Sequence, residues 1–208
     1  MKKRKQTGRV RVVAKADLPT RYGRFSIVAI EGKGADDEAV AIYHGRLDAA
    51  NNTGKAPLVR VHSQCLTGDV FTSQRCDCRA QLELSLRKIA KAPSGVLLYL
   101  PQEGRGIGLL NKIKAYALQD EGLDTVEANR QLGFDADSRD YDFAAAALKA
   151  LGVRSVRLLS NNPDKIEQLE RGGVRVVERV PCRPRTSHHS RAYLRTKKNK
   201  MGHLLARL

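Results

Sequence analysis

The amino-acid sequence predicts a single domain of the α/β class, in which helices and strands are mixed (α+β). Its 208 residues suffice for one large domain or two small ones, and 41% of them are hydrophobic, enough for a sizeable core without disulfides. Strand-like runs dominate residues 24–63, whereas helical and strand patterns alternate over residues 79–180. No repeat, low-complexity tract or clear linker divides the chain, so we expect one domain.

Three strands are expected first, because β-type runs are separated by links rich in Gly, Asp and Asn: residues 24–30, 38–45 and 57–63. A helix over residues 79–92 follows, since Leu82, Leu86 and Ile89 recur at helical spacing. The short apolar run 94–100 is typical of a buried strand.

Helices and strands alternate in the second half of the chain. A helix over residues 108–122 ends at a glycine, and a second over residues 137–152 begins with cap-type residues and ends at another glycine. A strand–helix–strand unit is expected next, over residues 154–160, 163–173 and 174–180. We also expect the tail, residues 188–208, to be helical.

The net charge of +16 is concentrated at the two ends of the chain. Residues 1–24 carry a net charge of +8 and residues 171–208 a net charge of +10, whereas the residues between them carry −2. This distribution is more typical of solvated tails, or of a tail that closes over an anionic ligand, than of a nucleic-acid-binding face. Tryptophan is absent and aromatic residues make up 5%, so base-stacking platforms are scarce. We expect residues 1–15 to form a flexible basic tail and residues 16–208 the folded domain.

A cytoplasmic location is expected, since no apolar run approaches the length of a membrane span and the first residues lack the apolar centre of a signal peptide. In a reducing compartment, clustered cysteines indicate metal ligands or reactive thiols rather than disulfides.

Three of the four cysteines fall within fourteen residues: Cys65, Cys76 and Cys78. A C-x-C pair can present two thiolates to one ion, and the ten-residue excursion can return a third, a donor set that suits Zn²⁺. His62 and the distant Cys182 are the candidates for a fourth ligand. If neither binds, the open position is typical of a catalytic zinc that carries water. The alternative is a group of buried cysteines without metal, which the polar neighbours disfavour.

Three long motifs resemble GTP cyclohydrolase II: "RVHSQCLTGDVFTSQRCDC", "PQEGRGIGLLNKIKAYALQDEGLDTVEANRQLGFDADSRDY" and "LLSNNPDKI". The similarity extends over nearly the whole chain. It implies hydrolysis of GTP with release of pyrophosphate, and of formate from carbon 8 of guanine. The implied product is 2,5-diamino-6-(5-phosphoribosylamino)pyrimidin-4(3H)-one, the first intermediate of riboflavin synthesis. One Zn²⁺ per chain, Mg²⁺ with the nucleotide and a homodimer are also implied.

The resemblance assigns roles to individual residues. Cys65, Cys76 and Cys78 would hold the zinc, and Tyr116 would position water or a ring nitrogen near it. Asp137 would accept a proton. Arg139 would attack the α-phosphate as a nucleophile, but a guanidinium stays protonated in most settings, so a phosphate-clamping role is the alternative. The alternatives that do not use the resemblance are an ordinary buried helix tyrosine for Tyr116 and a polar helix cap for the "DADSRD" segment.

The resemblance also implies a set of nucleotide contacts: Arg60, Val61, His62, Ser63, Gln64, Gln81, Glu103, Gly104, Arg105, Thr125, Ser160 and Lys165. We add Glu127 as a candidate carboxylate for guanine. Gln64 stands where the family commonly has glutamate, which removes a charge beside the metal. Two other functions stay open: a specialised paralogue that stops at a formylated intermediate or serves another pathway, and a nucleic-acid-associated protein with a structural zinc.

Overall fold

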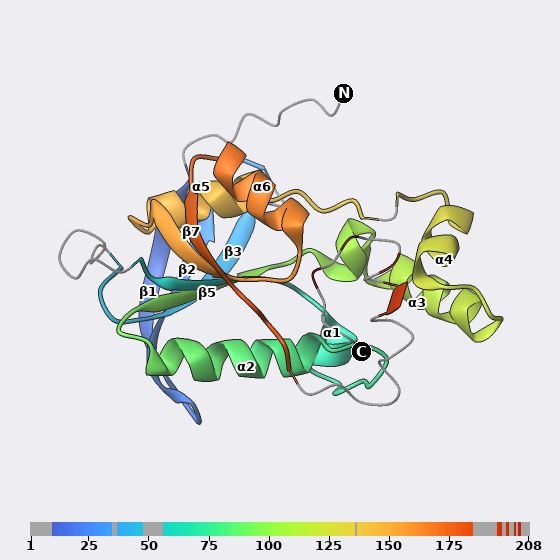
Figure 1. Ribbon diagram of the computed structural model, residues 1–208, viewed down its shortest axis with the longest axis horizontal. Coiled ribbons are helices and arrows are strands. Elements are labelled where there is room, and N and C mark those ends of the chain that lie inside the picture. Colours follow the sequence, from blue (N-terminus) through green and yellow to red (C-terminus); the bar gives the residue numbers. More distant parts are fainter. Residues whose placement is uncertain are drawn as a thin grey trace.

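A seven-stranded mixed sheet with helices on both faces forms the core of the protein (Figure 1). The computed structural model describes residues 10–34, 37–47, 56–135 and 137–184, together with residues 195, 196, 199, 202 and 204. Within these residues, the alternation of strands and helices confirms the α/β class with mixed strand directions.

The strands are ordered β1-β2-β3-β5-β4-β6-β7 across the sheet. Their bounds are β1 Arg11–Thr20, β2 Gly23–Glu31, β3 Glu38–His44, β4 Leu58–Ser63, β5 Gly95–Leu100, β6 Ser155–Leu159 and β7 Arg175–Val180. In this order, β1, β2, β3 and β5 each pair antiparallel with the next strand. The strands β5, β4, β6 and β7 run parallel to one another. The carboxyl ends of these four strands therefore meet at one edge of the sheet.

The first strand was not expected from the sequence. Residues 11–15, placed in the flexible basic tail, form the first half of β1 and pair with β2. Most of β1 is exposed, because it is an edge strand. Its sequence "RVVAKADLPT" therefore lacks the apolar alternation by which a half-buried strand is recognised.

The helices are α1 Leu66–Asp69, α2 Cys78–Lys91, α3 Gly108–Asp120, α4 Thr125–Gln131, α5 Asp142–Ala150 and α6 Pro163–Arg171, with a short turn η2 Glu103–Gly106. One core lies between the sheet and α5 and α6, and it includes Leu148 and Leu169. A second core lies on the opposite face, under α2, and includes Ile89. Helices α3 and α4 lie beyond the edge of the sheet, on the side of α1 (Figure 1).

The helix expected over residues 137–152 is shorter than the sequence indicated, because α5 begins at Asp142. The side chain of Asp137 accepts a hydrogen bond from the backbone N–H of Arg139 (3.1 Å), and such local bonds compete with helix formation. Most of the expected helix over residues 188–208 lies outside the described residues. Among the helices that the structure does describe, none has the length and apolarity needed to span a membrane.

Candidate active site

The candidate site lies where β4 and β5 end, because parallel neighbours deliver their following loops to the same edge. The backbone N–H of Gln64, just after β4, donates to the carbonyl of Leu100 at the end of β5 (2.8 Å). A pocket opens beside this link. The predicted site residues that line it are Ser63, Gln64, Cys65, Cys76, Cys78, Glu103, Gly104, Arg105, Tyr116, Thr125 and Arg139.

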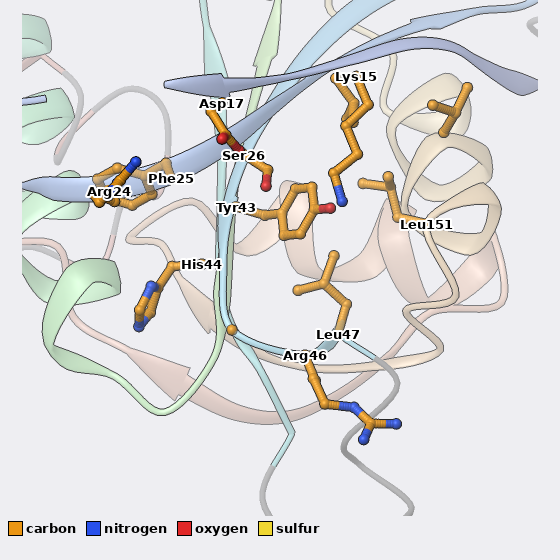
Figure 2. A pocket seen from close by; sticks show the side chains of 13 residues that line it. Lys15, Asp17, Arg24, Phe25, Ser26, Tyr43, His44, Arg46, Leu47 and Leu151 are labelled. Atoms are coloured by element: carbon orange, nitrogen blue, oxygen red, sulfur yellow. The ribbon is translucent and has the colours of Figure 1, made fainter. Parts of the chain in front are cut away.

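A larger cavity, of about 700 Å³, lies elsewhere, on the outer strands β1, β2 and β3 (Figure 2). The ammonium of Lys15 points toward the Tyr43 hydroxyl there, and their hydrogen bond lowers the pKa of Tyr43 (Figure 2). None of the predicted site residues lines this cavity. The pocket beside the cysteines encloses only about 90 Å³, so chemistry rather than size identifies the candidate site.

The three clustered cysteines come together in space, as the sequence predicted. Cys65 follows β4 and Cys78 begins α2, and the three sulfur atoms lie within 4.8 Å of one another. The Sγ atoms of Cys65 and Cys76 are 3.6 Å apart, and all three thiols are free. Gly68 in α1 leaves room for them, since a Cβ there would lie 3.0 Å from the Cys76 sulfur and 3.1 Å from the Cys65 sulfur. This sulfur donor set fits a soft, tetrahedral metal ion.

Neither candidate for a fourth protein ligand joins the cluster. His62 is buried, and its Nε2 lies 3.0 Å from Asp69 Oδ2. Cys182 is buried in the core under α2, where its carbonyl accepts a hydrogen bond from Asn161. Within the described residues, the group of potential metal ligands therefore consists of three cysteines. Three protein ligands are typical of catalytic zinc rather than structural zinc.

Lys112 places a positive charge beside this cluster. Its Nζ lies 3.1 Å from Cys65 Sγ and 2.7 Å from Glu103 Oε1. Burial opposes the charged form of Lys112, but the hydrogen bond to Glu103 and the charge of Cys65 outweigh burial and raise its pKa. Hydrogen bonds from Cys76 and Cys78, together with the charge of Lys112, lower the pKa of Cys65. The hydrogen bond with Cys65 raises the pKa of Cys76 to about 11. The contact with Lys112 therefore favours the thiolate form of Cys65.

Tyr116 of α3 lines the same pocket as the three cysteines. Its hydroxyl lies 3.1 Å from Thr67 Oγ1, and the guanidinium of Arg75 lies 4.9 Å from the centre of its ring. Burial raises the pKa of Tyr116, so the hydroxyl keeps its proton near neutral pH. The side chain is therefore held as a neutral hydrogen-bonding group, which agrees with a positioning role.

Asp137 and Arg139 form an ion pair on the loop before α5. The Arg139 Nε donates to Asp137 Oδ1 (2.8 Å), and its Nη2 donates to Oδ2. Burial alone would raise the pKa of Asp137, but the hydrogen bonds and charge of Arg139 lower it. The backbone N–H of Ser138 donates to the carbonyl of Arg105 (3.1 Å), which fixes this loop to the pocket wall. Arg105 itself has φ of 62°, a strained conformation of the kind that clusters at functional sites.

The predicted proton acceptor Asp137 does not line the pocket, and neither do several predicted nucleotide contacts: Arg60, Val61, His62, Gln81, Glu127, Ser160 and Lys165. The guanidinium of Arg60 donates to the carbonyl of Leu159 (3.1 Å) and to Gln81. The buried Lys165 ammonium donates to the carbonyl of Val61 (2.8 Å). These groups join distant parts of the chain inside the protein, so their contact with a nucleotide stays a prediction.

Glu127 and Ser160 also make local contacts. The Glu127 carboxylate accepts the backbone N–H of Asp124 (2.9 Å) as half of a capping box that starts α4, and the residue is exposed. The Ser160 hydroxyl accepts the backbone N–H of Asn162 (3.1 Å). For Glu127, the structure supports a capping role and places the side chain outside the pocket.

Sequence reasoning missed five polar residues that line the pocket: Arg75, Gln102, Lys112, Gln119 and Asn129. Lys112 precedes Tyr116 by one helical turn, so α-helical spacing puts both on one face of α3. That spacing was the signal available for Lys112, and Gln119, three residues after Tyr116 in the same helix, shares it. The other three lack a pattern of this kind.

The three cysteines that could hold a metal ion line one pocket together with Arg139, the partner of the Asp137 carboxylate, and this arrangement is typical of metal-dependent hydrolases. More specifically, the family model of GTP cyclohydrolase II matches residues 10–181, and the chain belongs to this family of hydrolases.

Curated relatives agree with this assignment. The GTP cyclohydrolase-2 of Buchnera aphidicola is 51% identical over 197 residues, which cover 95% of this chain and 100% of that protein. The riboflavin biosynthesis protein RibBA of Endomicrobium trichonymphae is 50% identical over 196 residues, covering 94% of this chain and 48% of that protein. The chain thus spans about half the length of this RibBA relative.

Among solved structures, RibBX, a two-domain 3,4-dihydroxy-2-butanone 4-phosphate synthase from A. baumannii, matches with a TM-score of 0.42 and 21% identity. The match covers 75% of this chain and 35% of that chain, and it is too distant to support an inference.

Proposed function

We propose that this chain hydrolyses GTP, opening the imidazole ring of guanine with release of formate and releasing pyrophosphate from the nucleotide. The product would be 2,5-diamino-6-(5-phosphoribosylamino)pyrimidin-4(3H)-one, and the reaction would be the first step of riboflavin biosynthesis. Membership of the GTP cyclohydrolase II family supports this proposal. The observation that carries it is that the three-cysteine group and Arg139, with its partner Asp137, serve the same pocket.

Zn²⁺ is the ion that we propose for the three-cysteine group. Thiolates are the donors that zinc prefers, and the closely spaced sulfurs of Cys65, Cys76 and Cys78 fit one ion. Bound there, zinc would supply a Lewis acid and an activated water at neutral pH, which the opening of an imidazole ring requires. Mg²⁺ would accompany the triphosphate, as is common where phosphates are bound.

Tyr116 and the charged groups of the pocket would position the nucleotide. The neutral Tyr116 hydroxyl can donate to a ring nitrogen or to water near the cysteines. Arg105 and Arg139 offer planar donors that suit phosphate oxygens. The remaining predicted contacts would then require side chains such as Arg60 and Lys165 to leave their present partners or to act through neighbouring groups.

The Asp137–Arg139 pair would act at the α-phosphate. The lowered pKa of Asp137 keeps its carboxylate ionised and able to accept a proton. Two roles for Arg139 stay open, the transient nucleophile of the family pattern and a phosphate clamp. Its bidentate contact with Asp137 favours a charged guanidinium, and therefore the clamp.

Further parts of the proposal concern assembly and location. We expect a homodimer in the cytoplasm, with the catalytic domain starting near residue 10 rather than residue 16, since β1 belongs to the sheet. Exposed apolar side chains on α3, among them Leu110 (79% exposed) and Ile113 (49% exposed), offer a surface for self-association.

Product analysis from GTP tests the proposal. The purified chain, supplied with Zn²⁺ and Mg²⁺, should release formate and pyrophosphate in equal amounts. Pyrophosphate without formate would instead favour the specialised paralogue that stops at a formylated intermediate. Unchanged GTP, together with RNA binding that weakens steeply with salt, would favour the nucleic-acid-associated protein.

A further inference from the structure

The backbone around Cys65 is held by two buried carboxylates from different parts of the chain. The N–H of Cys65 donates to Asp69 Oδ2 (3.1 Å), and the N–H of Leu66 donates to Glu103 Oε2 (2.6 Å). The two peptide groups that flank this cysteine are therefore fixed, one by α1 and the other by the turn after β5. Neither Cys76 nor Cys78 has a comparable pair among the hydrogen bonds of the described residues.

The carboxylate of Glu103 is fully engaged within the protein. Its Oε1 accepts the N–H of Gly104 (2.9 Å) and the ammonium of Lys112 (2.7 Å), while Oε2 accepts the N–H of Leu66. Glu103 is 7% exposed and Lys112 is 8% exposed. A carboxylate with three donors has little capacity left for a nucleotide, so its place in the pocket wall does not by itself make it a substrate ligand.

Lys112 connects this carboxylate to the sulfur of Cys65. Its Nζ lies between Glu103 Oε1 and Cys65 Sγ, 2.7 Å from the one and 3.1 Å from the other. An N–H···S hydrogen bond withdraws electron density from a thiolate, so a metal bound by that thiolate remains a stronger Lewis acid. Glu103 in turn fixes the position of Lys112, because the two form a buried ion pair.

We propose that Glu103 and Lys112 act as a positioning pair for Cys65, in which Glu103 fixes the backbone and Lys112 donates a hydrogen bond to the metal-binding sulfur. The proposal rests on the proposed metal-dependent function. It assigns Lys112 a role that the sequence did not suggest, and it moves Glu103 from nucleotide contact to ligand positioning. Both are positioning residues, since they act through Cys65.

The test replaces Zn²⁺ with Co²⁺, whose sulfur-to-metal charge-transfer bands report on the ligands directly. Lys112→Met removes the hydrogen bond, which raises the energy of the sulfur electrons, so these bands should move to longer wavelength. Lys112→Arg keeps a donor and should restore much of the wild-type spectrum. Lys114→Met is the matched control, because Lys114 is exposed on the same helix, and its spectrum should be unchanged.

Activity provides a second readout. Formate release by Lys112→Met should fall about 10- to 100-fold, the usual range for partners of metal ligands, while pyrophosphate release stays near the wild-type rate. If Lys112→Met does not fold, Glu103→Gln carries the test, since the amide oxygen can still accept from Leu66 but the charge that holds Lys112 is lost. It should shift the bands in the same direction.

Wild-type cobalt spectra in both Lys112→Met and Glu103→Gln would overturn the proposal. Equal losses of formate and pyrophosphate with an unchanged spectrum would also overturn it, and would make Lys112 a nucleotide contact. The spectra are recorded without GTP, so they decide the role of the pair even if the chain proves inactive on GTP.

Discussion

Gly68→Ala adds a single methyl group at the three-cysteine cluster and tests whether those sulfurs hold a metal. The new Cβ would lie 3.0 Å from the Cys76 sulfur, 3.1 Å from the Cys65 sulfur and 3.3 Å from the Cys78 Cβ. Favourable contacts between such atoms begin at about 3.5 Å, so the sulfurs must move by roughly 0.5 Å. Metal sites tolerate bond-length errors of only about 0.2 Å. Zinc affinity should therefore fall by at least about tenfold, or ~1.4 kcal/mol.

The same substitution should leave the protein folded, because a helix preference for alanine offsets part of the packing cost. Gly68 lies inside α1, where alanine is favoured over glycine by about 0.5–1 kcal/mol. Competition with a chelating dye would measure zinc affinity, and urea unfolding would measure stability. Val70→Ala, which alters a 59% exposed side chain at the end of the same helix, is the control. Wild-type zinc affinity in a folded Gly68→Ala protein would refute the reasoning.

The other predictions concern the ion pair and two buried basic side chains. Arg139→Ala should stop pyrophosphate release but leave bound zinc unchanged, and wild-type turnover would exclude Arg139 from the mechanism. Burial lowers the pKa of His62, so protons bind preferentially to the unfolded chain and stability should fall as pH drops below about 6.5. His62→Gln should make this fall shallower in urea titrations at several pH values, and an identical slope would contradict the assignment. Burial likewise lowers the pKa of Lys165 well below 10.5, so Lys165→Met should raise the free energy of unfolding at pH 7, because the substitution removes the cost of burying the amino group. A less stable Lys165→Met protein would show that the contact with Val61 outweighs the cost of burying the charge.

The elements with strong apolar periodicity were predicted almost residue by residue. Residues 79–92 correspond to α2, Cys78–Lys91, and residues 94–100 to β5, Gly95–Leu100. The edge strand β1 was missed because exposure on both faces removes the alternation that reveals a strand. Helix α4 was missed although its capping box, Asp124 with Glu127, is legible in the sequence, because its seven residues are too few to give a clear apolar period.

The cysteine group was predictable from its spacing, whereas Tyr116, Thr125 and Arg139, which lie farther along the chain and line the same pocket, were predicted only through the family resemblance. The cysteine group spans fourteen positions, and its spacing alone indicated a metal site. The internal contacts of Arg60 with Leu159 and of Lys165 with Val61 join residues about a hundred positions apart. No local pattern reports such contacts, and they arise only when β4, β6 and α6 have packed together.

The most direct test of the account compares zinc content and formate release in the wild-type protein and in Cys76→Ser. Each chain of the wild type should hold one zinc ion and should convert GTP with equal release of formate and pyrophosphate. Cys76→Ser should lose most of its zinc and all formate release, because one of the three sulfur ligands is gone. Full formate release by a Cys76→Ser protein that contains no zinc would contradict the central claim.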